Sequence, residues 1–183
     1  MSRILALFFA LTLPSLGLAQ NRAESYPVYK STYVNDYANA IEAGAEGRIA
    51  TALQALREDT GIEATVLTLY TRRSYSSGTL EDFVTALFNH WGIGDAQRND
   101  GILVLVVTED RDMRIELGSG YGRGFDGEAQ DIIDRVFIPA FKRGDFSTGI
   151  EEGTRAVIER IARVQAAGEA PPKRDNDAGT DGL

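Results

Sequence analysis

Six consecutive apolar residues, ILVLVV at positions 102–107, constrain the fold of this chain more than any other feature of its sequence. A strand whose side chains are apolar on both faces must be covered on both faces, so it must lie inside a sheet with helices on its two sides. After a short polar turn, Met113, Ile115 and Leu117 alternate with polar residues, as expected of an antiparallel neighbour that shows one face to water. These two segments therefore predict the centre of a sheet and one adjoining strand.

The remaining periodicity supplies a further strand and the helices around this pair. Residues 62–70, IEATVLTLY, are rich in β-branched side chains and predict a strand. Apolar residues recur at helical spacing in four other segments: 42–60, 79–91, 126–143 with Asp126 as its cap and a kink at Pro139, and a last helix that starts at Asp145 or Ser147. The order of elements predicts an α/β fold, namely a three-layer α/β/α sandwich with a small mixed sheet. Its strand–helix–strand portion should be a right-handed parallel crossover.

The first nineteen residues are typical of a cleavable export signal. Arg3 precedes an apolar stretch at 4–13 that is too short to span a bilayer, and the small residues Gly17 and Ala19 stand at the −3 and −1 positions of a cleavage site. We therefore expect cleavage after Ala19 and a periplasmic or secreted product. No later apolar run is long enough to span a membrane, so the mature chain is not expected to do so.

Composition divides the rest of the chain into three parts. We expect an N-terminal extension at 20–32, one domain at 33–164, and a disordered tail at 165–183, where hardly any large apolar side chain occurs. The chain contains no cysteine. Disulfides, cysteine-based zinc sites and thiol nucleophiles are therefore excluded, and packing alone must stabilise the domain.

Net charge and residue usage exclude some functions. The formal net charge of −8 argues against nucleic acid as a partner, because phosphate binding needs a basic face, whereas a cationic partner or a metal ion is compatible with it. The single histidine, His90, lies two residues before the glycine that ends its helix, where a capping role is more typical than catalysis. No serine, histidine and aspartate set can be assembled from the pattern.

Antiparallel pairing should bring two polar segments together at one end of the central strand. Asn99 and Asp100 precede this strand and should lie beside the glycine-rich segment 118–122, which follows its partner. Their oxygens suit a hard cation, while free N–H groups of the glycine segment suit an anion; a plain turn with a helix cap explains the same residues. The opposite end carries the acidic turn 109–112, about 20 Å away. Arg72 and Arg73 follow the strand at 62–70, at the end where open α/β sheets usually bind ligands, which conflicts with a site at Asn99 and Asp100.

Several ordered segments resemble the TPM domain, a family with thylakoid-lumen, photosystem-repair and receptor-modulating members. They are YVNDYA at 33–38, DTG at 59–61, FNHWGIG at 88–94, NDGILVLVV at 99–107, RDMRIELGSGYG at 111–122 and IPAFKRGDFSTGI at 138–150. The resemblance covers residues 33–162. It implies an α/β/α fold, location in a lumen or periplasm, a role beside membrane-bound complexes, and, as in some members, weak acid phosphatase activity and divalent-metal binding.

Carried over by position, the resemblance implies four site residues. Asp36, Asn99 and Asp100 would hold Ca²⁺ or Mg²⁺, with no organic cofactor, and Arg114 would be the catalytic residue that steadies a phosphate. The leading hypothesis is an exported accessory or binding protein that supports assembly or repair of membrane complexes, with an envelope or membrane protein complex as its partner. The alternative is a weak metal-dependent acid phosphatase, so whether the chain is an enzyme stays open.

Overall fold

A four-stranded mixed sheet forms the centre of the molecule. The computed structural model describes residues 25–171; residues 1–24 and 172–183, which hold the expected signal peptide and most of the expected tail, lie outside this description. The strands are β1 (Val34–Asp36), β2 (Ala64–Leu69), β3 (Ile102–Val107) and β4 (Asp112–Leu117), in the order β1-β2-β3-β4. β1, β2 and β3 are parallel, and β4 is antiparallel to β3.

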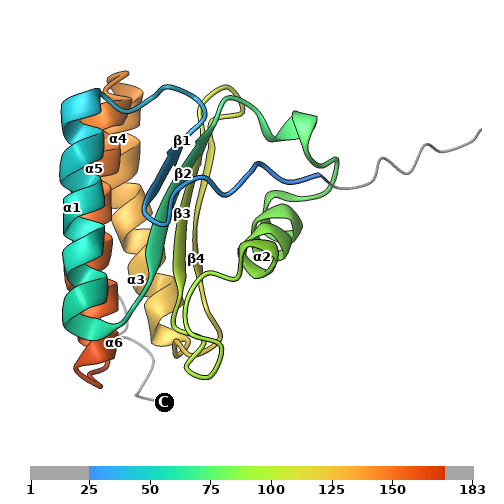
Figure 1. Cartoon of the computed structure of the whole chain (residues 1–183). Coiled ribbons are helices and arrows are strands. Elements are labelled where there is room, and N and C mark those ends of the chain that lie inside the picture. The colour runs from blue at the N-terminus through green and yellow to red at the C-terminus, as the bar shows by residue number, and fades with distance from the viewer. Residues whose placement is uncertain (1–24, 172–183) are drawn as a thin grey trace, which may run out of the picture.

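Helices cover both faces of this sheet, which confirms the three-layer α/β/α sandwich (Figure 1). One layer contains α1 (Ala43–Thr60), α3 (Gly124–Ile132), α4 (Ile138–Lys142), α5 (Phe146–Val157) and α6 (Arg163–Ala166). The opposite layer contains α2 (Leu80–Trp91). Among the described residues, no helix combines the length and the apolar character needed to cross a membrane.

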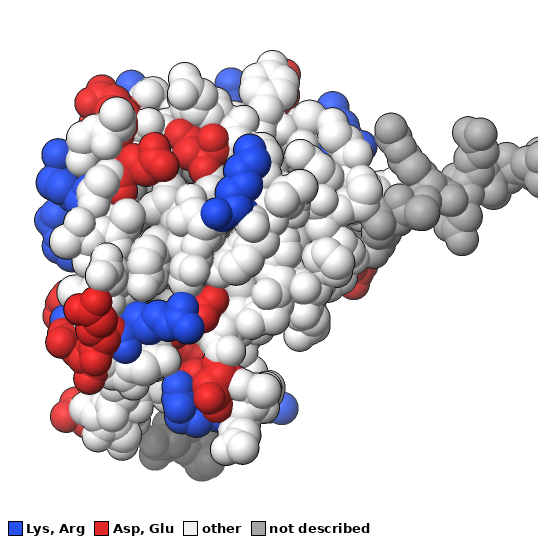
Figure 2. Space-filling view, viewed as in Figure 1, with Lys and Arg blue, Asp and Glu red and all other residues white. Residues whose placement is uncertain are grey.

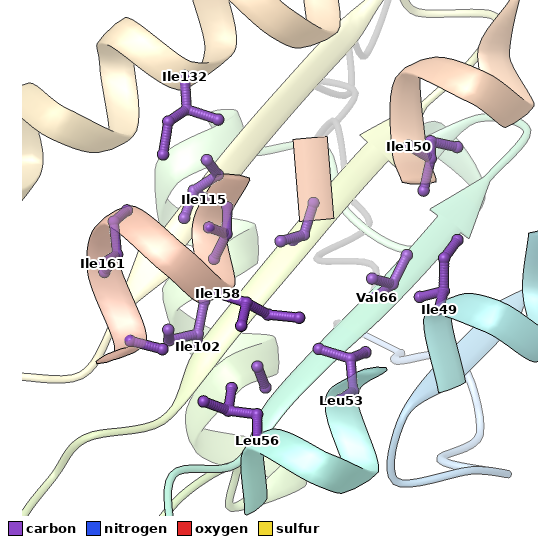
Figure 3. Packing of buried hydrophobic residues seen from close by; sticks show 14 of the residues in the cluster. Ile49, Leu53, Leu56, Val66, Ile102, Ile115, Ile132, Ile150, Ile158 and Ile161 are labelled. Atoms are coloured by element: carbon purple, nitrogen blue, oxygen red, sulfur yellow. The ribbon is translucent and has the colours of Figure 1, made fainter. Parts of the chain in front are cut away.

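The central strand divides its side chains between two hydrophobic clusters, as its apolar run predicts. Ile102, Val104 and Val106 pack with α1, α3 and α5, and the alternate residues of β3 pack with α2. Figure 3 shows Ile102 within the larger cluster, which also contains Leu56 of α1 and Ile115 of β4. Every residue of β3 is buried, so the prediction of a strand covered on both faces is confirmed.

The edge strand β1 is absent from the sequence-based prediction. It has only three residues, Val34–Asp36, and two of them, asparagine and aspartate, are depleted in strands. Its neighbours in the chain also pack on the domain: Tyr29 contacts Trp91 at the end of α2, whose indole N–H donates to the Pro27 carbonyl at 3.0 Å. The packed unit therefore begins before residue 33.

Most helix ends follow their sequence signals. The Thr79 hydroxyl accepts from the backbone N–H of Asp82 at 3.1 Å and so caps α2, and Gly61 and Gly92 end α1 and α2 in left-handed conformations. Asp145 caps α5 by accepting from the Thr148 backbone N–H.

The helical region after β4 differs from its prediction at two points. α3 begins at Gly124, so Asp126 lies in the first turn and is not the cap. Pro139 does not simply kink a regular helix: the turn before it, Ile133–Phe137, is π-helical, and Pro139 stands at the start of α4. The missing N–H of proline removes one regular hydrogen bond, and the wider turn accommodates this loss.

Candidate functional site

The glycine-rich segment after β4 lies against the turn that precedes β3, as the antiparallel pairing predicts. The Gly120 backbone N–H donates to the Asn99 carbonyl at 2.9 Å, and the Tyr121 hydroxyl donates to the Asp100 carbonyl at 3.0 Å. A Cβ atom at Gly118 would stand 2.1 Å from the Asn99 carbonyl oxygen. These glycines therefore permit close contact between two backbones, which is a role that needs no ligand.

The Asp100 side chain stabilises the turn before β3 through hydrogen bonds. It is 4% exposed, and its carboxylate accepts from Arg98 Nε at 2.6 Å and from the Asp95 backbone N–H at 3.4 Å. The hydrogen bond to Asp100 is the main cause that raises the pKa of Arg98, and the same guanidinium also donates to the Gly61 carbonyl at 3.0 Å. Asp100 thus ties this turn to the end of α1, whereas the neighbouring Asn99 is exposed.

The Asp36 carboxylate organises the turn between β1 and α1. It accepts from the backbone N–H groups of Ala40 and Ile41, each at 3.0 Å, and from the Thr68 hydroxyl of β2. Three protein donors therefore occupy this carboxylate. Its local role resembles that of a helix cap, because it satisfies N–H groups just before α1 begins.

Strand register separates the three expected metal ligands. Asp36 pairs with Thr68 at the carboxyl end of the parallel strands, whereas Asn99 and Asp100 precede β3 at its amino end. The distance along the sheet is about 20 Å at about 3.3 Å per residue. Asp36, Asn99 and Asp100 consequently do not fit a single ion, and residues 25–171 contain no group of three or more histidine or acidic side chains arranged to hold one.

Arg114 lies in the middle of a charged cluster on the α2 side of β4. Its Nε donates to Glu116 at 2.6 Å and its terminal nitrogen lies 3.3 Å from Glu81, while the Thr85 hydroxyl donates to Glu116 at 2.6 Å. Partial burial lowers the pKa of Arg114, but the hydrogen bond and charge of Glu116, with the charges of Glu81 and Asp126, outweigh this effect and raise it. The guanidinium therefore stays charged and is already paired with carboxylates.

Two cavities lie along β4 and border this cluster. One, of about 350 Å³, is lined by Arg114 and its two strand neighbours together with residues of α2 and α3. The other, of about 390 Å³, lies between the end of α2 and the end of β4 and is lined by Glu116, Asn99 and Phe88, among others. Arg114 and Asn99 thus border neighbouring cavities, with Glu116 between them.

Sequence reasoning did not identify Glu81, Thr85 or Glu116 as site residues. A signal for Glu116 was present, since residues two apart in a strand share a face and Arg114 therefore points to the same side as Glu116. The α2 residues had no such signal, because their approach to β4 depends on how the helix crosses the sheet.

On the face seen in Figure 2, over α1 and the β1 edge, acidic and basic side chains are interspersed between uncharged areas.

The profile of the TPM domain matches residues 34–160. The chain belongs to the TPM domain family. This assignment confirms the resemblance seen in the sequence segments from YVNDYA to IPAFKRGDFSTGI. No curated protein matches the chain significantly.

Solved structures share the same fold. The solution structure of the N-terminal domain of a protein from P. gingivalis is 30% identical, covers 80% of this TPM-domain chain and 91% of its own, and superposes with a TM-score of 0.65. The BA42 protein of the psychrophilic bacterium Bizionia argentinensis is 22% identical, with coverages of 74% and 87% and a TM-score of 0.54. The N-terminal domain of the cg2496 protein of Corynebacterium glutamicum is 16% identical, with coverages of 84% and 89% and a TM-score of 0.54.

Proposed function

We propose that this TPM-domain chain is an exported accessory protein that binds a protein of the cell envelope and supports assembly or repair of a membrane complex. The observation that carries the proposal is the charged cluster of β4, in which Arg114 is paired with Glu116 and Glu81 beside two cavities. Charged side chains beside a concave surface give specific recognition of a protein partner when the partner presents complementary charges. The expected export signal supports a partner outside the cytoplasm, and the acidic composition favours a basic partner surface.

Cross-linking capture tests this function. Residues 20–183 carrying a photoreactive group at exposed Asn89, beside the larger cavity, are incubated with an envelope extract and illuminated. The same group at exposed Arg135 of the opposite helix layer is the control for random encounters. We expect one or a few proteins to be captured from the first position alone, and equal capture from both positions would contradict a binding role for the β4 side.

Binding of Ca²⁺ or Mg²⁺ stays a prediction for this chain. Because Asp36 and Asp100 lie at opposite ends of the sheet, a single ion can contact only one of them. The prediction therefore has two alternative locations. Calorimetric titration of the wild type, Asp36→Asn and Asp100→Asn with each ion distinguishes the ends. Loss of binding in one variant locates the ion, and absence of heat in the wild type would remove the metal from the proposal.

The alternative function is a weak acid phosphatase, and one observation favours testing it. Glu81 is 71% exposed at its side chain and contacts Arg114 at 3.3 Å, so it can move away and free part of the guanidinium for an oxyanion. Hydrolysis of p-nitrophenyl phosphate by the wild type and by Arg114→Gln provides the test. Activity that does not depend on Arg114 would exclude this residue from catalysis.

A further inference from the structure

β4 forms an open edge of the sheet. Its only sheet neighbour is β3, so one side of its backbone has no strand partner within residues 25–171. The bonds from Gly118 N–H to Gly101 O and from Gly120 N–H to Asn99 O fix which residues face β3. Residues whose backbone groups face the neighbouring strand alternate with residues whose groups face away from it. The backbone groups of Arg114 and Glu116 therefore hydrogen-bond to β3.

The outward residues of β4 are consequently Met113, Ile115 and Leu117. Their N–H and C=O groups point away from β3, and no hydrogen bond among the described residues satisfies them. Rows of unpaired backbone groups at a sheet edge are a template for pairing with a further strand. A natural edge is usually blunted, but the outer residues of β4 include neither proline nor lysine.

The smaller cavity lies along this same edge. Its about 350 Å³ are bounded by Leu80 and Glu81 of α2 on one side and by Ala129 of α3 and the following Ile133 on the other, with Met113–Ile115 between them. The edge is therefore the floor of a groove between two helix layers. An extended segment that enters the groove pairs with β4 and meets one helix layer with each of its two faces.

The two walls of the groove differ in chemistry. Toward α2, Arg114 is neutralised by Glu116, and the exposed Glu81 adds a further negative charge. Asp126 also lines the groove, and its carboxylate makes no hydrogen bond or ion pair with residues 25–171. The wall toward α3 combines the apolar Ala129 and Ile133 with the polar Asp126 and Gln130, and Met113 at its base packs on the main hydrophobic cluster.

We propose that the edge of β4 binds, as an added strand, an extended segment of a partner protein in which basic residues alternate with apolar residues. The backbone of the segment pairs with Met113, Ile115 and Leu117, its basic side chains face Glu81 on the α2 wall, and its apolar side chains pack toward Ala129 and Ile133 on the α3 wall. This inference rests on the proposed protein-binding function and specifies its surface and the chemistry of the partner. The charge complementarity of the groove selects a basic segment over an acidic one.

Amide hydrogen exchange measured by NMR provides the test. In the free full chain, the amides of Met113, Ile115 and Leu117 should exchange much faster than those of Arg114 and Glu116. The probe is a capped six-residue peptide of alternating lysine and valine, which matches the six residues of β4. At a peptide concentration of ten times Kd, exchange of the three outward amides should slow about tenfold, and a glutamate and valine peptide should have no effect.

Two variants isolate the backbone and the charge contributions. Met113→Pro removes one outward N–H without removing a bond to β3, and Met113→Leu is its control with the N–H retained. We expect the peptide to bind Met113→Leu like the wild type and Met113→Pro at least tenfold more weakly. Glu81→Gln, at a side chain that is 71% exposed, should weaken binding by about two- to fivefold, and added salt should reduce this difference.

Four outcomes would overturn the inference. Equal protection by the acidic peptide would refute the charge argument, and unchanged outward amides at saturating lysine peptide would refute strand addition. Protection that grows with protein concentration alone would assign the edge to a second copy of the chain. Outward amides that are slow in the free chain and become fast after deletion of residues 172–183 would assign it to the chain's own C-terminal segment.

The same variants separate this inference from the proposed function. If Met113→Pro still captures its envelope protein, the accessory function stands and the partner binds elsewhere. If the peptide protects the edge but no envelope protein is captured, the edge binds strands and the accessory function fails.

Discussion

Replacement of Gly118 by alanine tests whether the glycine-rich segment serves backbone packing. The new Cβ would stand 2.1 Å from the Asn99 carbonyl oxygen, whereas carbon–oxygen contacts in sheets lie at roughly 3.3 Å. The segment must therefore move by about 1 Å away from the turn before β3. This movement strains or breaks two bonds, Gly118 N–H to Gly101 O at 3.0 Å and Gly120 N–H to Asn99 O at 2.9 Å.

The expected loss of stability follows from these contacts. Two hydrogen bonds contribute about 1–3 kcal/mol together, and forced overpacking costs about 1–3 kcal/mol. Alanine also lowers the conformational entropy of the unfolded chain, which stabilises the folded state by about 0.4–1 kcal/mol. The free energy of unfolding should therefore fall by about 1–5 kcal/mol, which lowers the urea midpoint by about 0.5–2.5 M for an m value of about 2 kcal/mol/M.

Gly122→Ala is the matched control for this measurement. It lies in the same segment, its added Cβ would meet no atom within 4 Å, and its urea midpoint should stay near that of the wild type. Urea unfolding followed by circular dichroism compares the three proteins. If Gly118→Ala stays within about 0.5 kcal/mol of the control, the segment moves freely and the packing explanation is refuted.

Three further predictions concern the core and two titrating side chains. Leu56→Ala, at a side chain with 0% exposure, should lower the free energy of unfolding by about 2–5 kcal/mol in urea titrations. Burial raises the pKa of Tyr121 above its ordinary value of 10.0, so the wild type should lose stability relative to Tyr121→Phe as the pH rises past 10.0, in unfolding measured across alkaline pH. Backbone hydrogen bonds from residues 98 and 97 lower the pKa of Asp95 below 3.8, so the advantage of the wild type over Asp95→Asn should shrink as the pH falls below 3.8.

Local patterns predicted the elements whose burial is strongest. The apolar run 102–107 predicted a central strand, because such a strand must be covered on both faces. The alternation at 113–117 predicted its antiparallel partner, because such a strand is covered on one face only. Thr79 and Gly92 marked the two ends of α2, since their conformational preferences are local. Local signals also placed Asn99 beside Gly120, once the hairpin was recognised.

The site residues were harder to place because they depend on strand order and direction. Asp36 belongs to β1, which is too short to be recognised, and the parallel direction of β1 places it at the opposite end of the sheet from Asp100. Glu81 reaches Arg114 only because α2 crosses over β4. A family motif identifies positions along the chain. The distances between those positions in space depend on strand order, direction and register, which the motif does not give.

The path of the chain through the sheet includes one crossover of the less common hand. β1 leads to β2 through α1, and β2 leads to β3 through α2, both steps moving in the same direction along the sheet. The two helices nevertheless cover opposite faces, as their separate hydrophobic clusters demonstrate. Two crossovers with the same direction on opposite faces have opposite hands. Figure 1, in which β1 lies nearest the viewer, shows that β2–α2–β3 is right-handed as predicted and that β1–α1–β2 is left-handed, against a preference of about 98% for the right hand.

Burial accounts for this exception. β3 and β2 are apolar on both faces, and a right-handed β1–α1–β2 crossover would place α1 beside α2 on one face and remove its cover from Ala64 and Val66 on the other. The handedness preference arises from the twist of the strands that feed the crossover, and β1 is only three residues long, so it imposes little twist. With α1 and α2 on opposite faces, each helix layer ends at β4, and the outer edge of this strand is left open between them as the groove.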